Sequence, residues 1–143
     1  MGVWFSYDTT EGEQLEVRMG VSFVSVENAR LNLEAEQQER SFDDIRAAAR
    51  RSWNDDLGRI RVEGGTDAQK KVFYTGLYHA LIHPNVLSDV NGEYPAMESA
   101  EIRTAEGNRY TVFSLWDTYR NLHQLMTLVY PERQLEMVRS MIG

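Results

Sequence analysis

The N-terminal part of the sequence has the alternating pattern of half-buried β-strands. Between residues 15 and 23 every second side chain is apolar, and charged or small residues stand between them. Residues 8–12 have the composition of a turn, and a short aromatic run at residues 3–7 precedes them. The pattern predicts a hairpin over residues 3–23. Because an isolated hairpin is marginal in water, we expect it to need further strands beside it.

The segment that follows fits two conformations. Ser25 and Asn28 have the spacing of a helix start, and a helix through residue 33 can follow them. Leu31 and Leu33 also fit the alternation of a strand. We favour the helix, and the strand stays open as the alternative.

Two capping boxes predict two longer helices. Ser41 and Thr66 each stand three positions before an acidic or amide side chain, as at the start of a helix. The predicted helices end near Gly58 and before Pro84, since the residue before a proline avoids the helical conformation. The apolar stripes that follow the two caps are Phe42, Ile45, Ala49, Trp53 and Leu57, and then Phe73, Leu77 and Leu81.

The C-terminal third is predicted to contain a hairpin and two helices. Residues 102–113 fit a hairpin that turns at residues 106–108. Ser114 stands three positions before Asp117 and predicts the cap of a helix that runs to residue 129. A last helix begins at Pro131. The stripe of the first of these helices is Leu115, Tyr119, Leu122, Met126 and Val129.

Composition narrows the function classes. The chain has 143 residues, of which 42% are hydrophobic and 26% charged, as in a globular domain and unlike a disordered segment. The net charge of -7 gives no indication of nucleic-acid binding, which needs clustered basic residues. No cysteine is present, which excludes disulfides and thiolate chemistry. No apolar run approaches the roughly 18 residues of a membrane span, and the N-terminus has no signal-peptide pattern.

Candidate chemistry gathers at the start of the predicted helix over residues 114–129. Trp116, Arg120 and His123 fall on one face at helical spacing, and Asp117 precedes Arg120 by three residues. A flat aromatic ring covers the C–H face of a sugar, and charged groups bind its vicinal hydroxyls through charge-assisted hydrogen bonds. The alternative is structural: Asp117 favours the helix start, Arg120 pairs with it, and Trp116 is in the core.

The histidines give no metal prediction. His79 and His83 have ligand spacing on one helix, but the glutamate of the H-E-x-x-H motif is missing between them. We expect His79 to be buried and hydrogen-bonded. The 22 carboxylates include no pair that the sequence alone can assign to glycoside hydrolysis, which needs a fixed separation between two of them.

Four stretches, in this order, resemble glycoside hydrolase family 92, the bacterial calcium-dependent α-mannosidases. They cover nearly the whole chain, and the ordered set is more specific than any one member. They are residues 21–30 with Asn32 and Leu33, Trp53-Asn54 with Leu57, residues 73–79 followed by Pro84, and residues 113–120.

The resemblance implies a mixed fold spanning a domain junction. Members of this family have an N-terminal β-sandwich, a helical connection and a C-terminal (α/α)6 barrel. The implied organisation is the end of the β-sandwich at residues 1–36, a helical linker at 37–65, and the opening helices of the barrel at 66–143. This agrees with the change from strand to helix patterns along the sequence.

The resemblance also implies a function. Family members are inverting exo-α-mannosidases that release terminal mannose from α-mannosides such as N-glycan mannose, and they need calcium. Trp116, Asp117 and Arg120 match the segment that binds the mannose, so we favour them as substrate-binding residues. No stretch matches the family's general acid and base or most of its calcium environment. We therefore expect no catalytic residue here, no assignable metal ligand, and calcium bound mostly by other parts of the full-length enzyme.

Partners and location follow from the same resemblance. The expected partners are mannose-containing oligosaccharides and the remaining parts of the enzyme, and the expected location is secreted, periplasmic or on the bacterial cell surface. Two alternatives stay open, a small non-enzymatic module that binds mannosides and a helical interaction module whose apolar faces pair with a partner.

Overall fold

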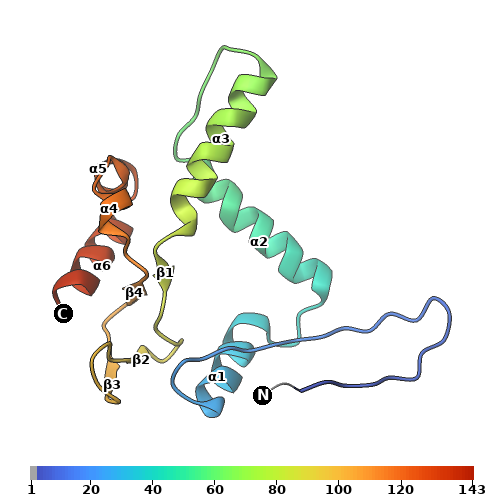
Figure 1. The fold of residues 1–143 in the computed structure, drawn as a ribbon. Helices are drawn as coiled ribbons and strands as arrows, with labels where there is room; N and C mark the ends of the chain where they lie inside the picture. The colour runs from blue at the N-terminus through green and yellow to red at the C-terminus, as the bar shows by residue number, and fades with distance from the viewer. Residues whose placement is uncertain (1–2) are drawn as a thin grey trace.

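Helices and two small sheets follow one another along the chain in the computed structural model, which describes residues 3–143 (Figure 1). None of the helices in this range is long and apolar enough to cross a membrane. In chain order the elements are α1 (Val26–Gln37), α2 (Phe42–Leu57), α3 (Asp67–Ile82), β1 (Asn85–Val86), β2 (Glu93–Pro95), β3 (Ile102–Thr104), β4 (Tyr110–Thr111), α4 (Leu115–Thr118), α5 (Leu122–Val129) and α6 (Pro131–Ile142).

The first three helices begin at the predicted capping residues. The Ser25 hydroxyl accepts a hydrogen bond from the backbone N–H of Asn28 at 3.0 Å, which confirms the helix rather than the strand in this segment. Ser41 and Thr66 form the two predicted capping boxes at the starts of α2 and α3. His83, which precedes a proline, is extended and ends α3 as expected.

The predicted hairpin over residues 3–23 does not form. The segment is extended, as Figure 1 shows, but it pairs with no strand among residues 3–143. Its polar face is anchored instead: Arg18 donates to the carbonyls of Gln38 and Arg40 at 2.8 and 3.0 Å. Its apolar face is uncovered, and Val17 is 81% exposed. The backbone N–H and C=O groups of a β-strand need hydrogen-bond partners on a neighbouring strand. Residues 3–143 provide no such strand beside this segment.

The hairpin predicted over residues 102–113 is also wrong, because its two halves belong to different sheets. β3 pairs with β2, and β4 pairs with β1, both antiparallel. The β2–β3 hairpin is therefore nested inside the β1–β4 pair. The turn at Gly107 has a φ of 88°, and the loop beside it is held by Glu136 of α6, whose carboxylate accepts from the backbone N–H of Asn108 at 3.3 Å.

The helix predicted over residues 114–129 is broken at Asn121. This residue has a φ of 69°, in the left-handed region that asparagine tolerates better than most residues. The break leaves one short turn, α4, and a separate helix, α5. Trp116, Arg120 and His123 therefore do not share one helical face.

The core lies where α3, β4, α5 and α6 meet. Met126 and Tyr130 are fully enclosed, and Met137, Leu77 and Tyr110 complete the buried cluster. Burying a methionine stabilises a fold by about 1.5–3 kcal/mol. The helix-rich chain forms no closed barrel within residues 3–143. Many large apolar side chains on α2, α3 and α6 remain outside this cluster.

Candidate functional site

The candidate sugar-binding residues lie on α4 and the turn that follows it, which leads into α5 and α6 (Figure 1). Two residues with left-handed backbone angles flank them, Val112 with a φ of 64° and Asn121 with a φ of 69°. A β-branched residue such as valine is rarely found at such an angle, because its side chain crowds the backbone. Residues held in such conformations concentrate at functional sites.

Trp116 is a surface residue in this structure. Its side chain is 78% exposed, so the interpretation of Trp116 as a core residue is wrong for residues 3–143. Asp117, next to it, is also exposed. The two side chains offer an aromatic surface and a carboxylate to solvent.

Asp117 does not act as the capping partner that the sequence suggested. The Ser114 hydroxyl makes no side-chain cap to the backbone of α4 and donates to the Asp117 carboxylate at 2.5 Å. This bond orients one oxygen of the carboxylate. The other oxygen accepts no hydrogen bond from residues 3–143.

Arg120 does not pair with Asp117. Its Nε donates to the Tyr119 hydroxyl at 3.0 Å, and its guanidinium carbon lies 5.4 Å from the centre of the Tyr119 ring. Neither Asp117 nor Arg120 belongs to an ion pair within residues 3–143. Both charged groups are therefore available to a ligand, which is what binding of sugar hydroxyls requires.

A buried polar chain behind α4 was missed from the sequence. Thr118 is only 7% exposed, and its hydroxyl lies 3.0 Å from Nε2 of His123. Nδ1 of the same ring lies 3.1 Å from Oε1 of Gln134 on α6. In a continuous helix, residues five apart point about 140° away from each other. Only the break at Asn121 brings Thr118 and His123 together.

A second polar cluster joins α1 to the turn before β2. The buried carboxylate of Asp89 accepts hydrogen bonds from Ser22 at 2.6 Å, Asn32 at 2.6 Å and Asn28 at 2.8 Å. Burial by itself raises the pKa of Asp89, but these three donors outweigh it and hold the pKa below its ordinary value. Asn28 also donates to Glu93 at 2.8 Å. More than fifty residues separate the partners, so local patterns do not reveal the cluster.

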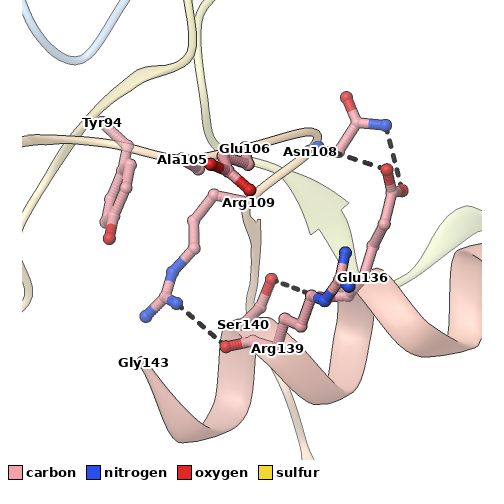
Figure 2. A pocket seen from close by; sticks show the side chains of 9 residues that line it. All are labelled: Tyr94, Ala105, Glu106, Asn108, Arg109, Glu136, Arg139, Ser140 and Gly143. Atoms are coloured by element: carbon pink, nitrogen blue, oxygen red, sulfur yellow. Dashed lines mark hydrogen bonds between the residues drawn. The ribbon is translucent and has the colours of Figure 1, made fainter.

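A cavity of about 290 Å³ lies between the loop at residues 105–109 and α6 (Figure 2). Trp116, Asp117 and Arg120 are not among the residues that line it. Two of its charged side chains, Arg109 and Glu136, already have partners. Arg109 donates to the carbonyl of Arg139 at 3.3 Å and lies 5.0 Å from the centre of the Tyr94 ring. The Asn108 side chain donates to Glu136 at 3.1 Å, as Figure 2 shows. These contacts connect the loop to α6.

The residues described do not form a metal site. His79 and His83 are both exposed, so the expectation of a buried His79 is wrong. Within residues 3–143, no three His, Asp or Glu side chains come together as metal ligands. The oxygens of Asp89 are occupied by amide and hydroxyl donors, which suits a carboxylate held by protein groups and does not suit a bound calcium ion. These residues by themselves do not fit calcium.

Comparison with solved structures shows close similarity. The chain is 38% identical to the GH92 alpha-mannosidase BT3965 from Bacteroides thetaiotaomicron, with a TM-score of 0.78 over 84% of this chain and 16% of that one. The structure of the same enzyme in complex with mannoimidazole gives the same values. The GH92 glycosyl hydrolase ccman5 is 31% identical, with a TM-score of 0.78 over 83% of this chain and 16% of that one.

The chain thus spans 16% of the length of these structures. No protein of curated function matches it at a significant level. The model of the glycosyl hydrolase family 92 catalytic domain matches residues 28–143, which is most of the sequence and includes the α4 segment. The chain belongs to glycosyl hydrolase family 92.

Proposed function

We propose that this chain is one part of a larger α-mannosidase and binds the mannose that the enzyme releases. The proposal rests on family membership and on the names of the solved relatives, which are alpha-mannosidases. The single observation that carries it is that Trp116, Asp117 and Arg120 are exposed on α4 and the turn after it, and that neither charged group forms an ion pair within residues 3–143. The substrates are mannose-containing oligosaccharides such as N-glycans.

Each of the three residues has a separate task in this proposal. The Trp116 ring covers a C–H face of the pyranose. The Asp117 carboxylate, oriented by Ser114, accepts hydrogen bonds from neighbouring hydroxyls, and Arg120 donates to another sugar oxygen. The solved complex of a relative with mannoimidazole supports a mannose-like ligand for the family. Fixing the sugar accelerates the reaction because the reacting groups are already in position.

The chemical step belongs to other parts of the enzyme. In an inverting glycosidase one carboxylic acid protonates the leaving oxygen, and a carboxylate activates water on the opposite face of the sugar. No residue of this chain receives either role. Calcium, when bound, would polarise and hold sugar oxygens, and we assign its ligands mostly to parts of the enzyme outside this sequence.

The domain organisation is also a proposal. Residues 1–36 would be the end of a β-sandwich, 37–65 a helical linker, and 66–143 the first helices of an (α/α)6 barrel. The uncovered apolar face of residues 15–23 supports strands beside it, and the exposed apolar side chains of α3 and α6 support further helices. The catalytic-domain match begins at residue 28, inside α1, so that model also describes α1 and α2.

The location of the enzyme is also inferred from family membership. We place it outside the cytoplasm of a bacterium, secreted, periplasmic or on the cell surface, where oligosaccharide substrates are available. Fractionation of the source organism with an antibody to residues 66–143 would test this. Recovery of the protein with cytoplasmic markers alone would contradict it.

The proposed reaction is tested by following mannose release from an α-mannoside by NMR, with the natural protein that carries this sequence and with calcium present. We expect β-mannose to be the first anomer that accumulates, because a single displacement inverts the anomeric carbon. Accumulation of α-mannose first would contradict the inverting mechanism. A pure, folded protein that releases no mannose would contradict the function.

A further inference from the structure

The single turn of α4 cannot fix its own orientation. It has four residues, and so short a helix is not stable by itself in water. Asn121 breaks its connection to α5, and Val112 before it has a left-handed φ of 64°. The positions of the exposed side chains on α4 therefore depend on what holds the turn from behind.

Thr118 is the residue of α4 that faces the interior. Its hydroxyl has one side-chain partner among residues 3–143, the imidazole of His123 on α5. The imidazole in turn meets Gln134 on α6. These contacts form a chain of side-chain hydrogen bonds from the sugar-binding turn to α5 and α6, which contribute Met126 and Met137 to the core.

For a neutral imidazole, the acceptor oxygen of Gln134 sets the direction of both bonds. Oε1 of Gln134 is an acceptor, so the nitrogen that faces it, Nδ1 of His123, carries the proton. Nε2 then has a free lone pair and accepts from the Thr118 hydroxyl. A neutral imidazole in this tautomer joins a donor on α4 to an acceptor on α6.

We propose that His123 is a positioning residue for mannose binding: through Thr118 it fixes the orientation of α4 and hence of Trp116 and Asp117. His123 itself does not touch the sugar in this proposal. The inference rests on the proposed function of the α4 segment and adds the residue that aligns it. Loss of the Thr118 bond would let the turn shift while the core of α5 and α6 stays intact.

Two matched threonine variants of the natural protein test the proposal. Thr118→Val keeps the size of the side chain and removes the hydroxyl that meets His123. Thr127→Val is the control, because within residues 3–143 the exposed Thr127 hydroxyl donates only to the backbone carbonyl of the same His123, at 2.7 Å. We expect kcat/KM for an α-mannoside to fall about tenfold in Thr118→Val, the size expected for one buried hydrogen bond, and to stay within about twofold in Thr127→Val.

Two histidine variants separate positioning from stability. In His123→Gln the side-chain amide lies near the position of Nε2 and can still hydrogen-bond with Thr118. In His123→Asn the shorter side chain places its amide near the position of Nδ1, where it can hydrogen-bond only with Gln134. Each variant loses one bond, so we expect similar falls in Tm. We expect the larger loss of kcat/KM in His123→Asn. Equal losses of kcat/KM in the two variants would overturn the proposal, since His123 would then act through stability alone.

Amide hydrogen exchange tests the same inference without any sugar. We expect the peptide that covers residues 114–121 to exchange faster in Thr118→Val than in the unmodified protein, and to be unchanged in Thr127→Val. Unchanged exchange in Thr118→Val would overturn the positioning role. If exchange rises as expected but the unmodified protein releases no mannose, the positioning inference holds and the proposed function fails, so the two failures are distinguishable.

Discussion

At the scale of single residues, a few backbone and side-chain groups determine the position and orientation of the candidate site. Asn121 adopts a left-handed angle, which ends α4 and turns the chain into α5. The same turn brings the Thr118 hydroxyl within hydrogen-bond distance of His123 and leaves Trp116 and Asp117 on the surface. The residues that prepare the site are therefore not the residues that would bind the sugar.

Replacing Asn121 tests the backbone requirement. In Asn121→Ala the left-handed angle becomes unfavourable, and we expect a loss of about 1 kcal/mol in the free energy of unfolding. Asn121→Gly is the matched control, because glycine adopts this angle without strain, and it should be close to neutral. Urea denaturation of the natural protein measures both. Equal stability of the two variants would contradict the account of the break.

Asp89 gives a second prediction at this scale. In Asp89→Asn an amide NH2 group would face side chains that donate to Asp89 in the native fold, so we expect a loss of about 1–3 kcal/mol at neutral pH. Asp55→Asn, on the exposed side of α2, is the control and should have little effect. A neutral result at Asp89 in urea denaturation would show that the cluster does not contribute to stability.

The pH dependence of the same variant follows from the pKa of Asp89. The folded protein holds this pKa below its ordinary value, because the three hydrogen-bond donors outweigh burial. The stabilisation is therefore complete above the unfolded pKa of about 3.9 and is lost as the pH falls through the lower folded pKa. We expect the stability difference between the unmodified protein and Asp89→Asn to narrow below about pH 4. A difference that is constant from pH 7 to pH 3 would contradict this.

At the scale of helices and strands, the sequence is informative where structure is determined locally. The caps at Ser25, Ser41 and Thr66 involve residues three positions apart, so their patterns predicted the starts of α1, α2 and α3 correctly. Strand pairing depends on distant partners. Residues 102–104 and 110–111 pair with β2 and β1, which no pattern within residues 102–113 can show.

Some features of the candidate site could likewise be predicted from the sequence, and others could not. The residue types at 116–120 and their resemblance to a family were readable from the sequence. Their exposure, the absence of an Asp117–Arg120 pair among residues 3–143 and the support from His123 were not, because they follow from one left-handed residue in an otherwise helical pattern. Asparagine occurs in helices too, so its presence alone does not predict a break.

The cap of α3 provides a prediction at this scale. Thr66→Ala removes the hydroxyl that accepts from the backbone N–H of Gln69, and we expect a loss of about 1 kcal/mol in the free energy of unfolding. Thr75→Ala, within α3 and exposed, is the control and should be neutral or slightly stabilising, because alanine favours helices. If both variants have the same stability in urea denaturation, the capping box does not determine where α3 begins.

At the scale of the whole molecule, the buried cluster is small relative to the apolar surface. The core centres on Met126, Tyr130 and Met137, while Val17 and other large apolar side chains are exposed. Exposed apolar faces of this extent favour association. We therefore expect residues 1–143, expressed alone, to melt without a sharp transition or to self-associate, as measured by thermal denaturation and sedimentation.

A sharp, cooperative melt of a monomer would contradict that expectation, because two-state unfolding is typical of a complete domain. It would instead favour the alternative of a small module that binds mannosides without hydrolysing them. An oligomer that is indifferent to mannose would favour an interaction module.

In the proposed function, α4 and the turn that follows it bind the mannose that the enzyme releases. The most direct test is the rate of mannose release by Asp117→Ala in the natural protein, with Asp55→Ala as the control for loss of an exposed carboxylate. We predict that Asp117→Ala lowers kcat/KM by about a hundredfold or more with the Tm unchanged, since a charged contact to the sugar is lost. Near-normal mannose release by Asp117→Ala would contradict the role of Asp117 and of α4 in binding mannose.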